Sequence, residues 1–164
     1  MRKILRRREV VMDDWEGAAT SGANEANASR IFPLSELIEN ANPWHAFSGR
    51  VGVALKPADK IEGIAPFLAR ACLVTVEFPG PGDGRGYTQA HLLRERYKFA
   101  GEVRAVGAGV KQDLLFFMAR SGIDSFDLAA GENFDSAQRA LNKYDVAYQP
   151  GVPLSSVRRQ RFFV

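Results

Sequence analysis

The chain has 164 residues, of which 46% are hydrophobic and 25% are charged, and its formal net charge is +3 with a pI of about 9.2. This length and composition indicate one globular domain with a core of its own and exclude a disordered chain. No apolar run approaches the roughly 20 residues that span a bilayer, and the basic start lacks the apolar segment of a signal peptide, so we expect a cytoplasmic protein that does not enter the membrane.

The first 49 residues are predicted to form an extension that packs on the rest of a single compact domain. Residues 4–15 favour a short strand or a hairpin, and residues 17–29, which are small and polar, favour a loop. Pro33, followed by apolar residues at helical spacing, predicts a short amphipathic helix. A turn is expected around Trp44.

From residue 50 onward the pattern alternates between strand and helix, and residues 50–164 are predicted to form an α/β core domain. The strands are expected at 50–57, 72–78, 102–107, 124–130 and 145–150, with helices at 61–71, 87–98, 110–121 and 134–144. Gly122 is expected to end the third helix and Asn133 to cap the start of the fourth.

Short alternating units of this kind imply parallel strands joined by right-handed crossovers. The leading interpretation is an α/β fold with a mostly parallel, open sheet in a three-layer, Rossmann-like or flavodoxin-like arrangement. Part of a β/α barrel is the alternative, because five strands cannot complete a barrel of eight.

The stretch from Phe78 to Gly86, FPGPGDGRG, is the main candidate site, because it follows a predicted central strand and precedes a predicted helix. Ligands of parallel α/β sheets bind beyond the carboxyl ends of the strands. Glycines allow close approach, and helix N–H groups attract an anion. Arg85 adds a guanidinium that suits carboxylate, phosphate or sulfate, and Asp83 is placed to orient it. An ordinary structural turn, with Asp83 in an Asx-turn, is the alternative.

Two further arginines stand where a charge needs a partner. Arg94 falls at the margin of the apolar face of helix 87–98, and Arg104 lies inside a predicted strand. For Arg94 a structural ion pair, with Asp83 or Asp113 as the acid, is favoured over a bound anion. Asp113 is also a candidate partner of Arg104 or Arg85, although an acid in a first helical turn has a structural explanation.

These residues define the predicted site. The candidates for ligand binding are Asp83, Gly84, Arg85, Gly86, Arg94, Arg104 and Lys111. Asp83 and Asp113 are the weak candidates for a catalytic acid or base, and no catalytic residue is assigned.

Other kinds of site find no support in the sequence. His45 and His91 lack the spacing of metal ligands, so no metal site is predicted, and Cys72 at the start of a buried strand is read as a structural thiol. No flavin, nicotinamide or P-loop fingerprint is present, which leaves any cofactor unknown. The basic ends are not interleaved with aromatic or glycine residues, so binding to nucleic acid is not expected.

A longer stretch, residues 78–126, resembles the core signature of a bacterial family of unknown function, with its most specific parts in DGRGYTQAHLLRERY and GEVRAVG. Members of that family are commonly described as oxidoreductases linked to sulfite reduction, and the family has no established catalytic residues. The positions that match the motif are Asp83, Gly84, Arg85, Gly86, Gln89, Leu93, Arg94, Arg96, Arg104, Gly107 and Asp113. Where the family usually has Arg-Cys-Gly-Phe, this chain has Arg120-Ser121-Gly122-Ile123, so no thiol is available there.

The resemblance implies an accessory protein, or an oxidoreductase, associated with assimilatory sulfite reduction. Its partners would be a sulfite reductase component or a small sulfur or phosphate anion. A small α/β enzyme for a phosphorylated or carboxylated metabolite and a non-enzymatic interaction or structural module stay as alternatives, so whether the protein is an enzyme is open. A homodimer is compatible with Trp44, Phe47, Phe162 and Phe163, which stand outside the predicted core.

Overall fold

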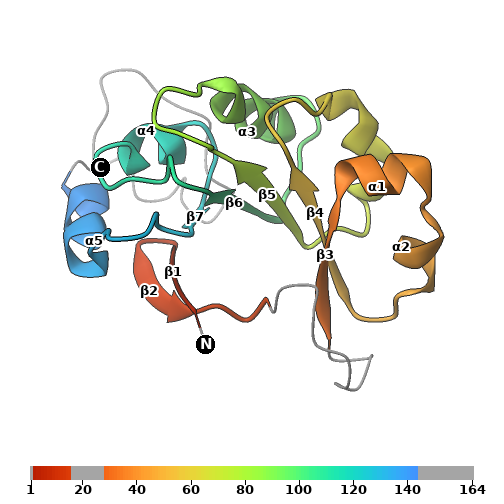
Figure 1. Ribbon diagram of the computed structural model, residues 1–164, viewed down its shortest axis with the longest axis horizontal. Helices are drawn as coiled ribbons and strands as arrows, with labels where there is room; N and C mark the ends of the chain where they lie inside the picture. Colours follow the sequence, from red (N-terminus) through yellow and green to blue (C-terminus); the bar gives the residue numbers. More distant parts are fainter. Residues whose placement is uncertain (1, 16–27, 144–164) are drawn as a thin grey trace, which may run out of the picture.

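The computed structural model describes residues 2–15 and 28–143 (Figure 1). The strands of the described part are β1 (Lys3–Arg6), β2 (Glu9–Met12), β3 (Ser29–Pro33), β4 (Arg50–Leu55), β5 (Leu73–Glu77), β6 (Glu102–Val106) and β7 (Ser125–Phe126). The helices are α1 (Leu34–Glu39), α2 (Asn42–Ala46), the 3₁₀ helix η2 (Ile61–Phe67), α3 (Arg85–Glu95), α4 (Leu115–Arg120) and α5 (Phe134–Asn142). Among these residues, no helix is long and apolar enough to cross a membrane.

All of these strands belong to one open sheet, in the order β2-β1-β7-β6-β5-β4-β3. β3 to β7 are parallel, and β1 pairs antiparallel with both β2 and β7. The predicted α/β fold with a mostly parallel, open sheet is confirmed. The parallel strands lie in chain order, as in part of a β/α barrel, whereas a doubly wound sheet reverses its order at a switch point.

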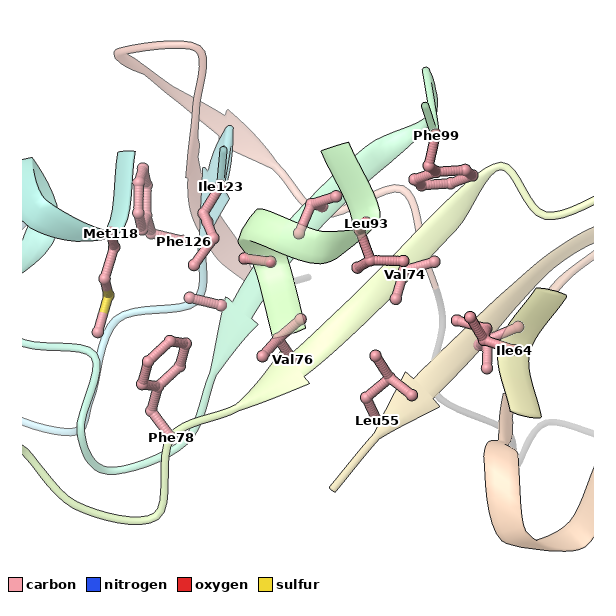
Figure 2. Close-up of a cluster of buried hydrophobic side chains, with 14 of the residues drawn as sticks. Leu55, Ile64, Val74, Val76, Phe78, Leu93, Phe99, Met118, Ile123 and Phe126 are labelled. Carbon is pink, nitrogen blue, oxygen red and sulfur yellow. The ribbon is translucent and has the colours of Figure 1, made fainter. Parts of the chain in front are cut away.

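This strand order places the connecting helices on one face of the sheet. Right-handed crossovers that all advance in the same direction lie on the same side. Figure 2 shows the result, because Val74 and Val76 of β5 meet Leu93 of α3, Ile64 of η2 and Met118 of α4 in one buried cluster. Each such side chain contributes about 1.5–3 kcal/mol when it is fully buried, so this cluster is the main source of stability.

The opposite face, here called the helix-free face because the connecting helices of the described residues lie on the other side, is defined by Thr75, Arg104 and Ser125. These three residues are neighbours in register on β5, β6 and β7. After β2 the segment Asp13–Trp15 lies over this face. A Cβ atom on Gly52 of β4 would meet the Trp15 ring at 3.3 Å and the Leu73 carbonyl oxygen at 3.1 Å. The absence of a side chain at Gly52 therefore lets the buried Trp15 ring lie against the sheet.

Most predicted elements are present. The hairpin, the strands beginning near 50, 72 and 102, and the short helix after Pro33 are all confirmed. Gly122 has a φ of +101°, as a helix-ending glycine does, and the Asn133 side chain accepts a hydrogen bond from Ser136 N–H. The expected strand at 145–150 lies outside the described residues, as does most of the loop predicted at 17–29.

Four local predictions differ from the structure. The strand β3 was not predicted, and it places part of the first 49 residues in the sheet, together with β1 and β2. The turn predicted around Trp44 is the helix α2. Gly63 and Pro66 make the second predicted helix a 3₁₀ helix, since a proline removes a backbone donor. The helix predicted from residue 110 begins only at Leu115, after a series of turns.

Candidate functional site

The DGRG turn, Asp83–Gly86, follows β5 at the carboxyl edge of the parallel strands, and its last two residues begin α3. Asp83 Oδ1 accepts hydrogen bonds from Arg85 N at 3.1 Å and Arg85 Nε at 3.0 Å, and Oδ2 accepts one from Nη2 at 2.6 Å. The turn is thus an Asx-turn, and Asp83 also orients the guanidinium. The hydrogen bonds from Arg85 hold the pKa of Asp83 at about 2, so the pair is ionised at neutral pH. The Arg85 side chain is nevertheless 61% exposed.

Three glycines of this edge lie in close contact with Phe78 and Gly80, in the segment that follows β5. A Cβ atom on Gly86 would lie 2.6 Å from the Phe78 ring, and one on Gly109 would lie 2.6 Å from the Gly80 carbonyl oxygen. Gly107 has a φ of +107°, and its Cβ would meet the Phe78 carbonyl oxygen at 2.5 Å. Gly109 N–H donates to that same oxygen at 2.8 Å. The two loops therefore pack backbone to backbone at Gly107 and Gly109, where side chains would separate them, and Gly86 leaves room for the Phe78 ring.

The other glycines in and just before the DGRG turn have a different environment. No atom lies within 4 Å of a Cβ placed on Gly80, Gly82 or Gly84, and none of the three has a positive φ. Neither packing nor backbone conformation requires glycine at these positions in this structure. They leave the surface beside Arg85 open, so that another molecule can approach the backbone closely.

Asp113 and Lys111 belong to the same edge. Both are exposed in the turns between β6 and α4. Burial raises the pKa of the Tyr87 hydroxyl, and the negative charge of Asp113 raises it further, which places Asp113 near the first turn of α3. Asp113 precedes α4 rather than lying in its first turn.

Arg94 lies near the other end of α3, roughly 14 Å along the helix axis from Arg85. Its guanidinium donates to the carbonyl oxygens of Phe99, Gly101 and Gly122 at 2.6, 2.7 and 2.9 Å. It also pairs with Asp124 at 3.2 Å. The side chain is 10% exposed, and burial lowers its pKa. The expected ion pair exists, but its acid is Asp124 rather than Asp83 or Asp113. Through these contacts Arg94 connects the segments at the amino-terminal ends of β6 and β7.

Arg104 lies on the helix-free face with 1% of its side chain exposed. Nη1 donates to Asp13 at 2.9 Å, and Nη2 and Nε donate to one oxygen of Glu102 at 2.8 and 2.9 Å. Ser125 Oγ donates to that same Glu102 oxygen at 2.6 Å. We call Arg104, Asp13, Glu102 and Ser125 the Arg104 cluster. A partner for the buried charge was predicted, but it is not Asp113.

The N-terminal hairpin extends this cluster. Arg6 lies 3.1 Å from Glu102, and Arg2 lies 3.2 Å from Asp13 and 2.9 Å from Asp127. Asp127 has a raised pKa, because burial outweighs the charge of Arg2. The cluster thus ties β1 and the segment after β2 to the centre of the sheet.

The predicted site residues therefore separate into three groups. Asp83, Gly84, Arg85, Gly86, Lys111 and Asp113 share the carboxyl edge, whereas Arg94 is at the amino edge and Arg104 is on the helix-free face. Sequence reasoning missed Asp13, Asp124 and Glu102 as partners. Glu102 carried a signal, because residues two apart in a strand share a face.

One minor candidate, Cys72, also differs from expectation. Cys72 precedes β5, and its side chain is exposed rather than buried. Within residues 2–15 and 28–143, no three or more His, Cys, Asp or Glu side chains are grouped so that they could hold a metal ion.

Comparison with known proteins identifies a family. A family model described as "Bacterial protein of unknown function (DUF934)" matches residues 52–156, more than half of the chain. The chain belongs to this family. The matched region of this DUF934 protein includes the DGRG turn, Arg94 and Arg104. No curated protein gives a significant match to the chain.

Proposed function

We propose that this DUF934 protein is an accessory protein of assimilatory sulfite reduction in the cytoplasm, and that it binds a small oxyanion at the DGRG turn. The association with sulfite reduction is supported by a resemblance: residues 78–126 resemble a family whose members are commonly described as oxidoreductases linked to sulfite reduction. The oxyanion site is supported by the arrangement around Arg85.

The observation that carries the proposal is the position of the Arg85 guanidinium. Asp83 accepts hydrogen bonds from Nε and Nη2 of Arg85, which leaves Nη1 of Arg85 for another partner. Arg85 is also the first residue of α3, where backbone N–H groups and the helix dipole favour a negative charge. A guanidinium suits the oxygens of sulfite, sulfate or phosphate. Because Asp83 neutralises part of this charge, we expect weak binding that is readily reversed.

The openness of the site favours an accessory role. Arg85 is mostly exposed, and the glycines beside it leave room for a second molecule. An enzyme usually encloses its substrate in a concave pocket. An exposed anion at a sheet edge is instead accessible to a partner such as a sulfite reductase component. The alternative is a small enzyme for a phosphorylated or carboxylated metabolite, in which Asp113 would act as a general base at the same edge.

A thermal-unfolding series with sulfite, sulfate and phosphate tests the proposal. An anion at about 100 times its dissociation constant should stabilise the fold by roughly 2.7 kcal/mol. Arg85→Ala should remove this stabilisation. The matched control is Arg96→Ala, because Arg96 is exposed directly after the same helix and pairs only with Glu62 at 3.5 Å among the ion pairs of the described residues.

The oxyanion site is rejected if no anion stabilises the wild-type protein, or if Arg85→Ala responds like the wild type. The accessory role has its own measurement, which is the rate of sulfite reduction by a purified reductase with and without this protein. A rate that rises with the wild type and not with Arg85→Ala supports the role. An unchanged rate removes it, even where the anion binds.

A further inference from the structure

The groups around Arg85 include acceptors of hydrogen bonds as well as donors. A carboxylate has room for about four hydrogen bonds. The Asp83 carboxylate accepts three from Arg85, two at Oδ1 and one at Oδ2, so Oδ2 can accept one more. The Asp83 side chain is 17% exposed, which leaves it partly accessible. Because an ionised carboxylate only accepts hydrogen bonds, an anion at this turn meets a negative oxygen beside the guanidinium.

Gln89 supplies a second acceptor on the same side of α3. It follows Arg85 by four residues, and residues four apart lie on one face of a helix. Gln89 is 6% exposed, and its Nε2 donates to the carbonyl oxygens of Lys56 and Asp59 at 2.9 and 3.2 Å. These two carbonyl groups fix the orientation of the amide. Its Oε1 is buried and has no hydrogen-bond partner among the described residues.

The Oε1 atom of Gln89 therefore lacks a donor. Buried polar atoms without a partner are rare, because each one costs free energy. The neighbouring turn does not provide the donor from its two ends, since Asp59 N–H donates to the Lys56 carbonyl oxygen at 3.0 Å and Lys56 N–H donates to Asp59 Oδ2 at 2.8 Å. A bound molecule with an O–H group can provide it, directly or through an ordered water.

We propose that the DGRG turn selects oxyanions that carry a proton, such as hydrogen phosphate and hydrogen sulfite, over sulfate. The selection rests on the proposed oxyanion site and specifies which anions it takes. The N–H groups of Arg85 that Asp83 does not use bind the ionised oxygens of the anion, and the O–H group of the anion donates to Asp83 or toward Gln89. Sulfate has no proton at neutral pH, so its oxygens oppose these acceptors. A site built around an acceptor rejects an analogue that lacks the matching donor.

Charge alone does not provide such a selection at this edge. Asp83 offsets Arg85, and Lys111 lies two residues from Asp113, so the edge has no large excess of positive charge. The preference therefore comes from the match of donors and acceptors, with the Asp83 carboxylate as the element that repels a fully ionised anion. For a protein associated with sulfite reduction, the consequence is that sulfate, a small anion of similar charge, does not occupy the site.

The test compares hydrogen phosphate with sulfate by isothermal titration calorimetry at about pH 8, where both are tetrahedral dianions that differ mainly in the proton. We expect the wild type to bind phosphate at least about tenfold more tightly than sulfate. In Asp83→Asn the negative acceptor is lost, although the amide oxygen can still accept from Arg85 N–H, so the preference should fall below about threefold. The matched control is Glu62→Gln, which removes an exposed acid paired with Arg96 at 3.5 Å and should keep the wild-type ratio.

Equal or tighter binding of sulfate by the wild type overturns the selection and leaves the oxyanion site intact, whereas a wild type that binds neither anion overturns both. A ratio that Asp83→Asn leaves unchanged also overturns the selection, because a purely structural role of Asp83 affects both anions alike. If Asp83→Asn does not fold, the wild-type ratio decides by itself. A second series with sulfite at about pH 6, where sulfite is mostly hydrogen sulfite, should again show binding at least about tenfold tighter than that of sulfate. The tighter of sulfite and phosphate in that series identifies the anion.

Discussion

Arg104 illustrates how a single buried charge organises several parts of the chain. Its partners come from the segment after β2, from its own strand and from β7. Desolvation makes a buried ion pair weak evidence for net stability, but removal of one partner leaves the other charge buried and unpaired. The main effect of the Arg104 cluster is therefore to fix the position of the N-terminal hairpin, rather than to increase the net free energy of unfolding.

Arg104→Ala is expected to lower the free energy of unfolding by about 3–5 kcal/mol, because Asp13 and Glu102 lose their buried counter-charge. Urea unfolding of the wild type and the variant measures this loss. Arg96→Ala, which removes an exposed charge, is the control and should cost less than about 1 kcal/mol. If the two variants unfold at the same urea concentration, the cluster has no structural role.

The elements show how far the sequence determined the fold. β4 and β5 were predictable because runs of apolar and β-branched residues are typical of buried parallel strands. β3 was not, since its five residues, SRIFP, include a serine, an arginine and a proline, and only tertiary pairing with β4 makes them a strand. Proline is tolerated there because β3 is an edge strand of the described sheet.

The same distinction applies to the candidate site. The Asx-turn and the Asp83–Arg85 pair were foreseeable, because both connect residues two positions apart. The partners of the other two arginines were not. Asp124 is 30 residues from Arg94, and Asp13 is 91 residues from Arg104. A single sequence gives no local pattern for such contacts. For this reason Arg94 and Arg104 were predicted to share one site with Arg85, although the three arginines lie in separate regions of the structure.

Gly86→Ala tests the packing of the start of α3 against the Phe78 ring. The added Cβ would lie 2.6 Å from the Phe78 ring, so the ring or the start of α3 must move. We expect a loss of about 1–3 kcal/mol, as for other overpacked sites. Gly82→Ala is the matched control, and open space around Gly82 should keep its effect within about 0.5 kcal/mol. Thermal or urea unfolding measures both values. Equal effects would show that the Phe78 ring moves aside at little cost.

At the scale of the whole molecule, the single-face arrangement of the helices gives the sheet two different surfaces. The apolar core fills one face, and the other carries a network of ion pairs that links distant strands. Asp14 joins Arg6 of β1 and Arg50 of β4, at 2.6 and 2.9 Å, although three strands lie between β1 and β4. The protonation of this acid should therefore affect how the hairpin is held across the sheet.

Asp14→Asn tests that link through its dependence on pH. Burial favours the neutral acid, but the hydrogen bonds from Arg6 and Arg50 outweigh it and lower the pKa of Asp14 to about 2. The unfolded value is about 3.9. The ionised form therefore stabilises the fold above pH 4, and this contribution is lost as the pH falls from about 4 to 2.

We expect Asp14→Asn to be less stable than the wild type at pH 6, with a difference that shrinks below pH 4 in urea unfolding. Glu62→Gln, which alters an exposed pair, should change stability little throughout. A difference between Asp14→Asn and wild type that stays constant from pH 6 to pH 3 would show that Asp14 acts by its shape and not by its charge.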